Sequence, residues 1–271
     1  SGLHSDQLGA LSSSAFEGLN SADLSALTSE ALAGLTSDQV GTLDTSEIQA
    51  LGTDIANLNT AALHALMSAQ LGALTTAQIA GLDSTDVAAL TSSALSGLHS
   101  DQLGALSSSA FEGMNSADLG ELTSEALAGL TTGQLSTLDS AELQALGTDL
   151  ANLNTAALHA LTSAQLGALT TAQVAGLDST DVAALTSNAL TGLHSDQLGA
   201  LSSSAFEGMN SADLSALTSE ALAGLTSDQV GTLDTSEIQA LGTDLANLNT
   251  AALHALTSAQ LGALTTAQIA G

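Results

Sequence analysis

The chain has 271 residues, 44% of them hydrophobic, and 28 acidic residues without a single Lys or Arg give it a formal net charge of −28. This balance excludes nucleic acid as a partner, because only cationic side chains displace counterions from a polyanion, and it removes the cations with which most active sites orient substrates. The lack of Cys excludes disulfides and thiolate metal sites, and no apolar run approaches the roughly 18 to 20 residues of a membrane span.

From Leu3 onward the chain is a series of eight-residue units, each of which reads as the start of a short helix. In unit 82–89, Asp83 takes the N-cap position and Asp86 the N3 position of a capping box, while Leu82 and Val87 can form a hydrophobic staple. The next capping residue follows eight positions later, so each helix has room for about one and a half turns. Such helices are unstable alone, and the units must therefore stack.

One unit in each block is shorter, and the blocks repeat. Six octads precede the seven-residue unit 51–57, five more octads follow it, and the segment that begins at Leu3 returns at Leu98 and at Leu193. The blocks are thus 3–97, 98–192 and an incomplete 193–271, in a single continuous repeat solenoid over 1–271 that we expect to be a segment of a longer chain. A larger side chain recurs once per block and is expected to fill a gap in the interior, at Phe16, Phe111 and Phe206.

A longer period predicts the geometry of the stack. The fifth position of the unit is Gln in every fourth unit, and position seven of the Gln units is Gly except at Ser136. We therefore predict an all-α, four-sided solenoid with about 32 residues per coil and three coils per block. A β-solenoid would also use Ser, Thr, Asp and Gly, but the apolar spacing and the paired cap and staple argue against it. The Gln residues are Gln7, Gln39, Gln70, Gln102, Gln134, Gln165, Gln197, Gln229 and Gln260.

Two units after each Gln, the fifth position is Asp, and these residues form the candidate metal site. Stacked in a column, they would place like charges along one edge, where Ca²⁺ would offset the repulsion, because a hard cation prefers carboxylate oxygens. The competing interpretation is that each Asp serves only its own helix cap. No other cofactor is expected. The candidate calcium ligands are Asp23, Asp54, Asp86, Asp118, Asp149, Asp181, Asp213 and Asp244.

The six histidines and the abundant serines do not indicate an active site. The histidines occupy only two positions of the block, represented by His4 and His64, and no convergent pair of ligands is visible. His4, Ser5 and Asp6 are consecutive, so their side chains cannot form a catalytic triad. Ser and Thr recur at the third position of almost every unit, as architectural residues do. The sequence therefore predicts a protein that is not an enzyme.

The units Leu74 to Gly81 and Leu161 to Ala168 resemble tracts in very large bacterial surface proteins, often labelled haem utilisation or adhesion proteins. This resemblance implies an exported, repetitive spacer, stalk or fibre. We accordingly expect a structural region of an extracellular or cell-surface filament, sheath or adhesin stalk that self-associates end to end. The alternative is a binding module that responds to calcium or other divalent cations, or that presents a carbohydrate-binding or ice-binding face.

Overall fold

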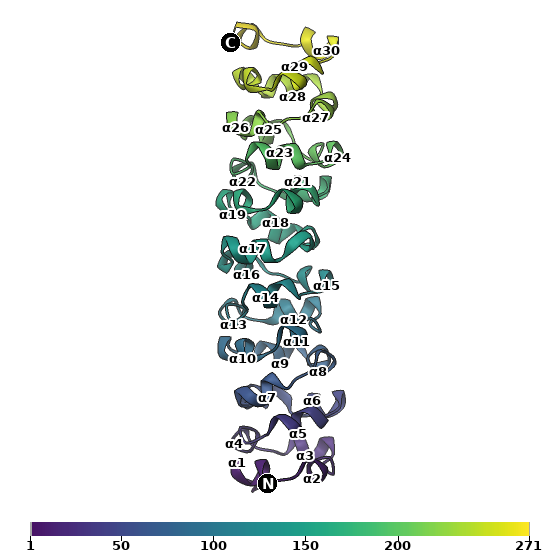
Figure 1. Ribbon diagram of the computed structural model, residues 1–271, viewed down its shortest axis with the longest axis vertical. Coiled ribbons are helices and arrows are strands. Elements are labelled where there is room, and N and C mark those ends of the chain that lie inside the picture. The colour runs from purple at the N-terminus through teal and green to yellow at the C-terminus, as the bar shows by residue number, and fades with distance from the viewer. Residues whose placement is uncertain (1, 271) are drawn as a thin grey trace. The chain divides into compact units, whose positions relative to one another are not determined.

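The computed structural model describes residues 2–270, and every regular element in that range is a short helix (Figure 1). The contacts group the chain into two compact units, Ser1–Leu138 and Asp139–Gly271, which are described separately below. The expected all-α architecture is thus confirmed for the described residues. That the chain is one continuous solenoid remains a prediction.

The first unit contains sixteen α-helices and one 3-10 helix among its described residues. They are α1 (Ser5–Gly9), α2 (Ser13–Phe16), α3 (Ser21–Ser25), α4 (Ser29–Leu32), α5 (Ser37–Thr42), α6 (Thr45–Ala50), η1 (Gly52–Asn57), α7 (Thr60–His64), α8 (Ser68–Ala73), α9 (Thr76–Ala80), α10 (Ser84–Ala89), α11 (Ser92–Leu95), α12 (Ser100–Ala105), α13 (Ser108–Phe111), α14 (Ser116–Gly120), α15 (Ser124–Leu127) and α16 (Thr132–Thr137).

The second unit repeats this pattern with fifteen α-helices and two 3-10 helices among its described residues. They are α17 (Ser140–Ala145), η2 (Gly147–Asn152), α18 (Thr155–Ala160), α19 (Ser163–Ala168), α20 (Thr171–Ala175), α21 (Ser179–Ala184), α22 (Ser187–Leu190), α23 (Ser195–Ala200), α24 (Ser203–Phe206), α25 (Ser211–Ala216), α26 (Ser219–Leu222), α27 (Ser227–Thr232), α28 (Thr235–Ala240), η3 (Gly242–Asn247), α29 (Thr250–His254), α30 (Ser258–Gly262) and α31 (Thr266–Ala270).

The helix starts have the predicted chemistry. At α10, Asp83 Oδ1 accepts hydrogen bonds from the backbone N–H groups of Thr85 (2.8 Å) and Asp86 (3.0 Å), and Asp86 Oδ2 accepts one from the N–H of Asp83 at 3.0 Å. The staple residues Leu82 and Val87 are both buried. The octads with Asp, Asn, Ser or Thr at the N-cap therefore contribute one capped turn with an apolar side chain on either side of the cap, whereas the N-cap side chains of His4, Met67, His99 and His194 accept no such hydrogen bond.

The seven-residue units differ from the octads, because each forms a 3-10 helix rather than an α-helix. The first residue of each 3-10 helix is a glycine with a backbone φ between +54° and +56°, in the left-handed region that a side chain disfavours. No other described residue has a positive φ. The seven-residue unit is thus accommodated by a glycine in the left-handed backbone conformation, at Gly52, Gly147 and Gly242.

Within each unit, the helices stack with a consistent offset. The principal contacts join each helix to the third element after it, as for α1 with α4 and α9 with α12 in the first unit, and α18 with α21 in the second. The expected stack of four octads per coil is not confirmed. Each helix packs against the third element after it in the chain, whereas the glutamine side chains reach back to the fourth element before them. These contacts bury the apolar first and sixth positions of the octads, including Phe16, Phe111 and Phe206 as predicted.

Candidate functional site

The candidate calcium residues at one block position lie at helix caps, and two of them are buried. Asp118 Oδ1 accepts a hydrogen bond from Ser92 Oγ at 2.6 Å, and Asp213 Oδ1 accepts one from Ser187 Oγ at 2.7 Å. Their Oδ2 atoms accept hydrogen bonds from the backbone N–H groups of the N-cap residues Asn115 and Asn210, both at 3.0 Å. The equivalent Asp23 keeps its cap but is exposed. The carboxylates of Asp118 and Asp213 therefore join two turns of the stack, because a serine of an earlier turn donates a hydrogen bond to each of them.

A second group of candidates lies in the 3-10 helices. Asp54 accepts a hydrogen bond from Ser29 Oγ at 2.8 Å, and Asp244 accepts one from Ser219 Oγ at 2.9 Å. Asp149 has the equivalent place in η2 and accepts one from Asn152 Nδ2 at 3.3 Å. At Asp54 and Asp244, the carboxylate is thus again joined to a hydroxyl 25 residues earlier in the chain.

The third group pairs two carboxylates at one helix start. Asp86 and Asp181 lie half-buried beside the N-cap residues Asp83 and Asp178. Burial raises the pKa of the Asp86 carboxyl, the N–H of Asp83 lowers it by hydrogen bonding, and the negative charge of Asp83 raises it. The same three causes raise the pKa of Asp181. At these two positions, burial and the neighbouring negative charge outweigh the hydrogen bond from the N-cap N–H.

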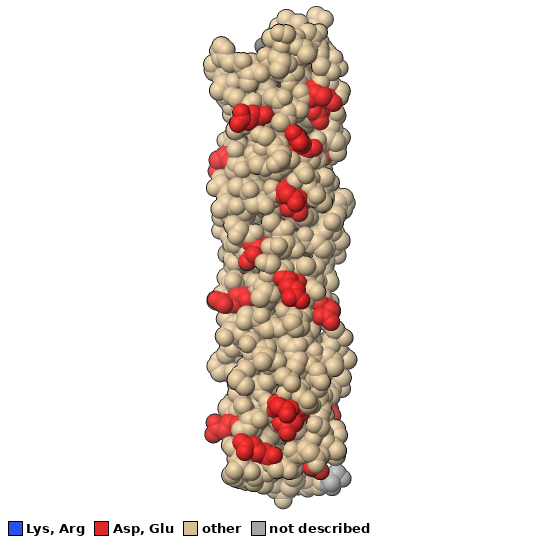
Figure 2. Space-filling view, turned by 90° about the vertical axis from the view of Figure 1, so that its right-hand side faces the viewer, with Lys and Arg blue, Asp and Glu red and all other residues tan. Residues whose placement is uncertain are grey.

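The described residues 2–270 contain no group of three or more His, Asp or Glu side chains arranged to hold a metal ion. The structure thus places the eight Asp candidates at separate caps and does not bring them together into one ligand set. On the face drawn in Figure 2, the carboxylates likewise lie in small groups separated by neutral surface. Calcium binding stays a prediction.

The two kinds of histidine have different surroundings. His4, His99 and His194 precede helices, and their Nδ1 atoms lie 3.3, 3.6 and 3.8 Å from carboxylate oxygens of Glu30, Glu125 and Glu220. His64 and His159 instead place Nδ1 3.2 and 3.0 Å from the carbonyl oxygens of Ala89 and Ala184. All five therefore make contacts between turns.

The glutamine side chains have a role that sequence reasoning found only in part. Gln39 Oε1 accepts the N–H of Thr36, which is the predicted capping box, but its Nε2 also donates to the carbonyl oxygens of Leu8 and Leu11, both at 2.9 Å. Gln70 repeats this with Val40 and Leu43. Each such carboxamide is buried and connects a helix start to carbonyls 27 to 31 residues earlier. The recurrence of Gln at the fifth position of every fourth octad is the sequence pattern that could have predicted these hydrogen bonds between turns.

Glycine at position seven of the Gln units permits close approach of two backbones. A Cβ on Gly72 would lie 2.6 Å from the carbonyl oxygen of Gly97, and one on Gly97 would lie 2.1 Å from that of Ser68. By contrast, nothing lies within 4 Å of a Cβ on Gly41 or Gly231. Those two glycines stand at the block position where the chain carries Ser136, so the one exception in the sequence falls where the structure has space.

The close approach leaves shallow grooves on the surface. One of about 480 Å³ is lined by residues that include Gly72, Gly97 and His99, and one of about 470 Å³ by residues that include Gly167 and Gly192. They lie at equivalent positions of the first two blocks, one in each unit. Small side chains, rather than reactive ones, make up most of their walls.

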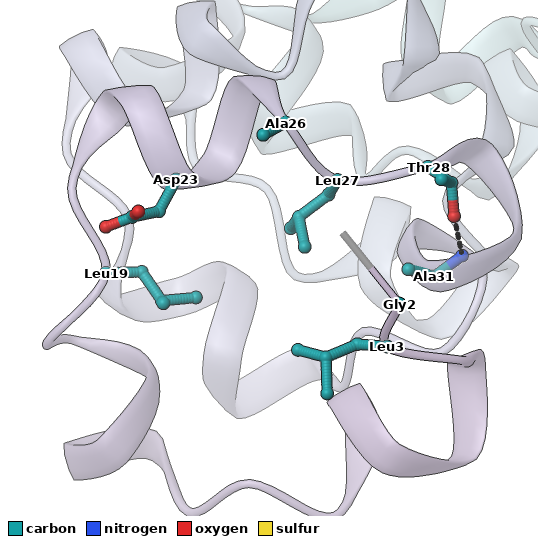
Figure 3. A pocket seen from close by; sticks show the side chains of 8 residues that line it. All are labelled: Gly2, Leu3, Leu19, Asp23, Ala26, Leu27, Thr28 and Ala31. Carbon is teal, nitrogen blue, oxygen red and sulfur yellow. Dashed lines mark hydrogen bonds between the residues drawn. The ribbon is translucent and has the colours of Figure 1, made fainter.

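The last turn of the second unit and the first turn of the first unit expose apolar side chains. Leu253, Leu261 and Ile269 are 40%, 51% and 71% exposed, and Leu3 is 41% exposed. The first turn also holds a pocket of about 210 Å³ between Leu3, Leu19, Leu27 and Asp23, among others (Figure 3). Among the described residues, Met67 is also a large apolar side chain at the surface, 52% exposed in the interior of the first unit.

None of the helices in the described part of the chain is long and apolar enough to cross a membrane. A search of curated proteins returned no match. The family model of the ALTTAQ repeat matches the chain seven times, at residues 16–53, 53–84, 79–115, 148–179, 174–209, 206–243 and 243–271. These matches cover most of the sequence, and the chain therefore belongs to the ALTTAQ repeat family.

Proposed function

We propose that this chain is a structural repeat segment of an extracellular filament, sheath or adhesin stalk, which assembles end to end and has no catalytic role. The observation that carries the proposal is the repetition of one turn-to-turn contact throughout each of the two compact units. A stack of this kind grows by adding further turns, because each turn presents the surface that the next one covers.

The side chains that recur in every block support the same proposal. Buried Gln carboxamides, Ser-bound Asp carboxylates and paired glycines all connect one turn to an earlier one, and none of them is directed at a separate ligand. In the solenoid that we propose, a coil holds between three and four units, since the interturn hydrogen bonds span 24 to 31 residues. The predicted four-sided coil is the upper limit of this range.

The surface charge suits an extracellular fibre. With a formal charge of −28, separate copies repel one another at low ionic strength and approach more closely when salt screens them. The resemblance to giant bacterial surface proteins and the lack of Cys are consistent with a cell-surface location. They are the basis for placing the protein outside the cell.

Electron microscopy of the purified protein tests the proposal. We expect filaments of uniform width in about 0.5 M salt, where the Debye length falls between the 10 Å of 0.1 M and the 3 Å of 1 M. Isolated particles of a single chain at all salt concentrations would contradict it. A parallel thermal melt with Ca²⁺, using Mg²⁺ at the same concentration as control, separates the alternative: a large shift with Ca²⁺ alone would favour a calcium-responsive module.

A further inference from the structure

Sulfur is confined to three side chains of this protein. The sequence contains no Cys, and its three methionines are Met67, Met114 and Met209. In the structure Met114 and Met209 are 3% and 4% exposed, whereas Met67 is 52% exposed in the interior of the first unit. Thioethers and thiols are the side-chain groups that peroxides oxidise most readily. Of the three sulfurs, Met67 therefore offers the accessible one.

Met114 and Met209 have the surroundings of core residues. Each takes the first position of its octad, the position at which Leu106 and Leu122 are buried in the octads on either side of Met114. A peroxide in solution meets these two side chains only when the fold opens around them. The two buried methionines thus form a reference of the same residue type for Met67.

Met67 stands where the other two blocks have a hydroxyl. It is the N-cap residue of α8, and the same position of the other blocks is Thr162 and Thr257. The Thr Oγ1 atoms accept hydrogen bonds from the backbone N–H groups of Gln165 and Gln260, at 3.2 and 3.3 Å. The side chain of Met67 accepts no such bond. Its sulfur therefore takes no part in a contact that the helix start requires.

The backbone of Met67 is nevertheless fixed on both sides. Its N–H donates to Gln70 Oε1 at 2.9 Å, and its carbonyl oxygen accepts a hydrogen bond from the N–H of Leu71 at 2.9 Å. The next two residues, Ser68 and Ala69, are small and exposed, so no bulky neighbour in the chain screens the thioether. A chemical change at the sulfur can thus occur without displacing α8.

We propose that Met67 is a selective site of oxidation by neutral peroxides, at which one oxygen atom is transferred to the sulfur. The sulfur lone pair attacks one peroxide oxygen, an S–O bond forms and the O–O bond breaks. The proton on the attacked oxygen moves to the leaving oxygen, so hydrogen peroxide yields water and an alkyl hydroperoxide yields an alcohol. The sulfur loses two electrons, which the peroxide gains, and the product is methionine sulfoxide.

The charge of the chain favours a neutral oxidant. With a formal charge of −28, the chain repels anionic oxidants at low ionic strength, whereas a neutral peroxide approaches without electrostatic repulsion. With hydrogen peroxide, the rate at Met67 should therefore change by less than about twofold between about 0.02 M and 0.5 M salt. The oxidation site goes beyond the proposed filament function and does not depend on it.

Peroxide treatment of the folded chain tests the proposal. After quenching, cleavage on the carboxyl side of Glu places the three methionines in the separate peptides 48–112, 113–121 and 208–220. Mass spectrometry then measures the gain of one oxygen, about 16 Da, in each peptide. One control is the same treatment in concentrated urea, where all three sulfurs are accessible. The other is Met67→Thr, which installs the residue of the other two blocks and its cap.

We expect Met67 to be oxidised at least about tenfold faster than Met114 and Met209 in the folded chain, and within about twofold of their rate in urea. The folded chain should gain a single oxygen while circular dichroism shows unchanged helix content, because the oxygen is added to an exposed thioether. Folded Met67→Thr should gain none over the same period.

Equal rates at the three methionines of the folded chain would overturn the proposal, as would a singly oxidised product that carries its oxygen at Met114 or Met209. Oxidation of folded Met67→Thr at the wild-type rate would overturn it too, because the reacting sulfur would then lie elsewhere. Loss of helix with the first oxygen added would contradict the conclusion that the fold does not depend on this sulfur.

Discussion

The same repeat position behaves differently in an interior turn and in the last turn of the second unit. Val174 in α20 is fully buried, whereas Ile269 at the equivalent position of α31 is 71% exposed. In the first unit, Gln102 is buried and donates to the previous turn, but Gln7 is exposed and satisfies only its own cap. The comparison teaches that an octad carries no core of its own, because the third element after it provides the cover.

The largest expected difference between interior and end turns comes from removing an apolar side chain. Leu166→Ala should lower the free energy of unfolding by about 2–5 kcal/mol, since the side chain is fully buried and leaves a cavity. Leu261→Ala, at the same block position but 51% exposed, should cost less than about 1 kcal/mol. Urea unfolding at low salt measures both, and equal losses would contradict the comparison.

Substitutions of two glycines test how closely the backbones of neighbouring turns approach each other. Gly129→Ala places a Cβ 1.8 Å from the carbonyl oxygen of Ser100, and the two backbones must separate, at a cost of about 1–3 kcal/mol or more. Gly41→Ala, inside α5 and with nothing within 4 Å, should instead stabilise by up to about 1 kcal/mol. Opposite shifts of the thermal midpoint are expected. Shifts of the same sign would show that the backbones do not meet at Gly129.

Removing a carboxamide tests the hydrogen bonds between turns. Gln102→Leu leaves the N–H of His99 and the carbonyl of Leu74 without their side-chain partner, so we expect a loss of about 1–3 kcal/mol. Gln7→Leu removes only the exposed bond to His4, and its effect on a single chain should be under about 1 kcal/mol. Hydrogen exchange of the His99 amide should rise in the first variant, and unchanged protection would argue against the bond.

The smallest expected effects concern charge and pH. The pKa of Asp86 is raised in the folded chain, so its ionisation opposes folding at neutral pH, and this opposition disappears when the pH falls below the unfolded value of about 3.9. Asp86→Asn should therefore raise the thermal midpoint at pH 7, and the gain should vanish near pH 3.

Asp234 provides the control of opposite sign. Hydrogen bonds from Ser236 Oγ and from the backbone N–H of Glu237 lower the pKa of this carboxyl and outweigh the desolvation that raises it. Its ionised form thus stabilises the folded chain above the unfolded pKa, and that contribution is lost as the pH falls. Asp234→Asn should lower the thermal midpoint at pH 7. Midpoints that move in the same direction for both variants would show that the two carboxyls do not differ as described.

Much of the local structure was predictable because its causes lie within eight residues. Asp83, Asp86, Leu82 and Val87 identify a cap and a staple without reference to the rest of the chain, and the structure confirms both. The Asp candidates were harder, since the sequence could not show that Ser92 reaches Asp118 from 26 residues away. Glutamine was placed correctly at N3, but its second set of hydrogen bonds is made to another turn.

By itself, the sequence determined the short capped helices, the apolar positions between them and the need to stack, because capping and nucleation are local properties of each octad. Only the tertiary structure decided which elements contact one another. Each helix packs against the third element after it in the chain, and the glutamine side chains form hydrogen bonds with the fourth element before them. The physical reason is that the offset follows from how closely two backbones approach, at contacts such as Gly97 against Ser68. That distance depends on both turns together and cannot be predicted from the sequence of either octad alone.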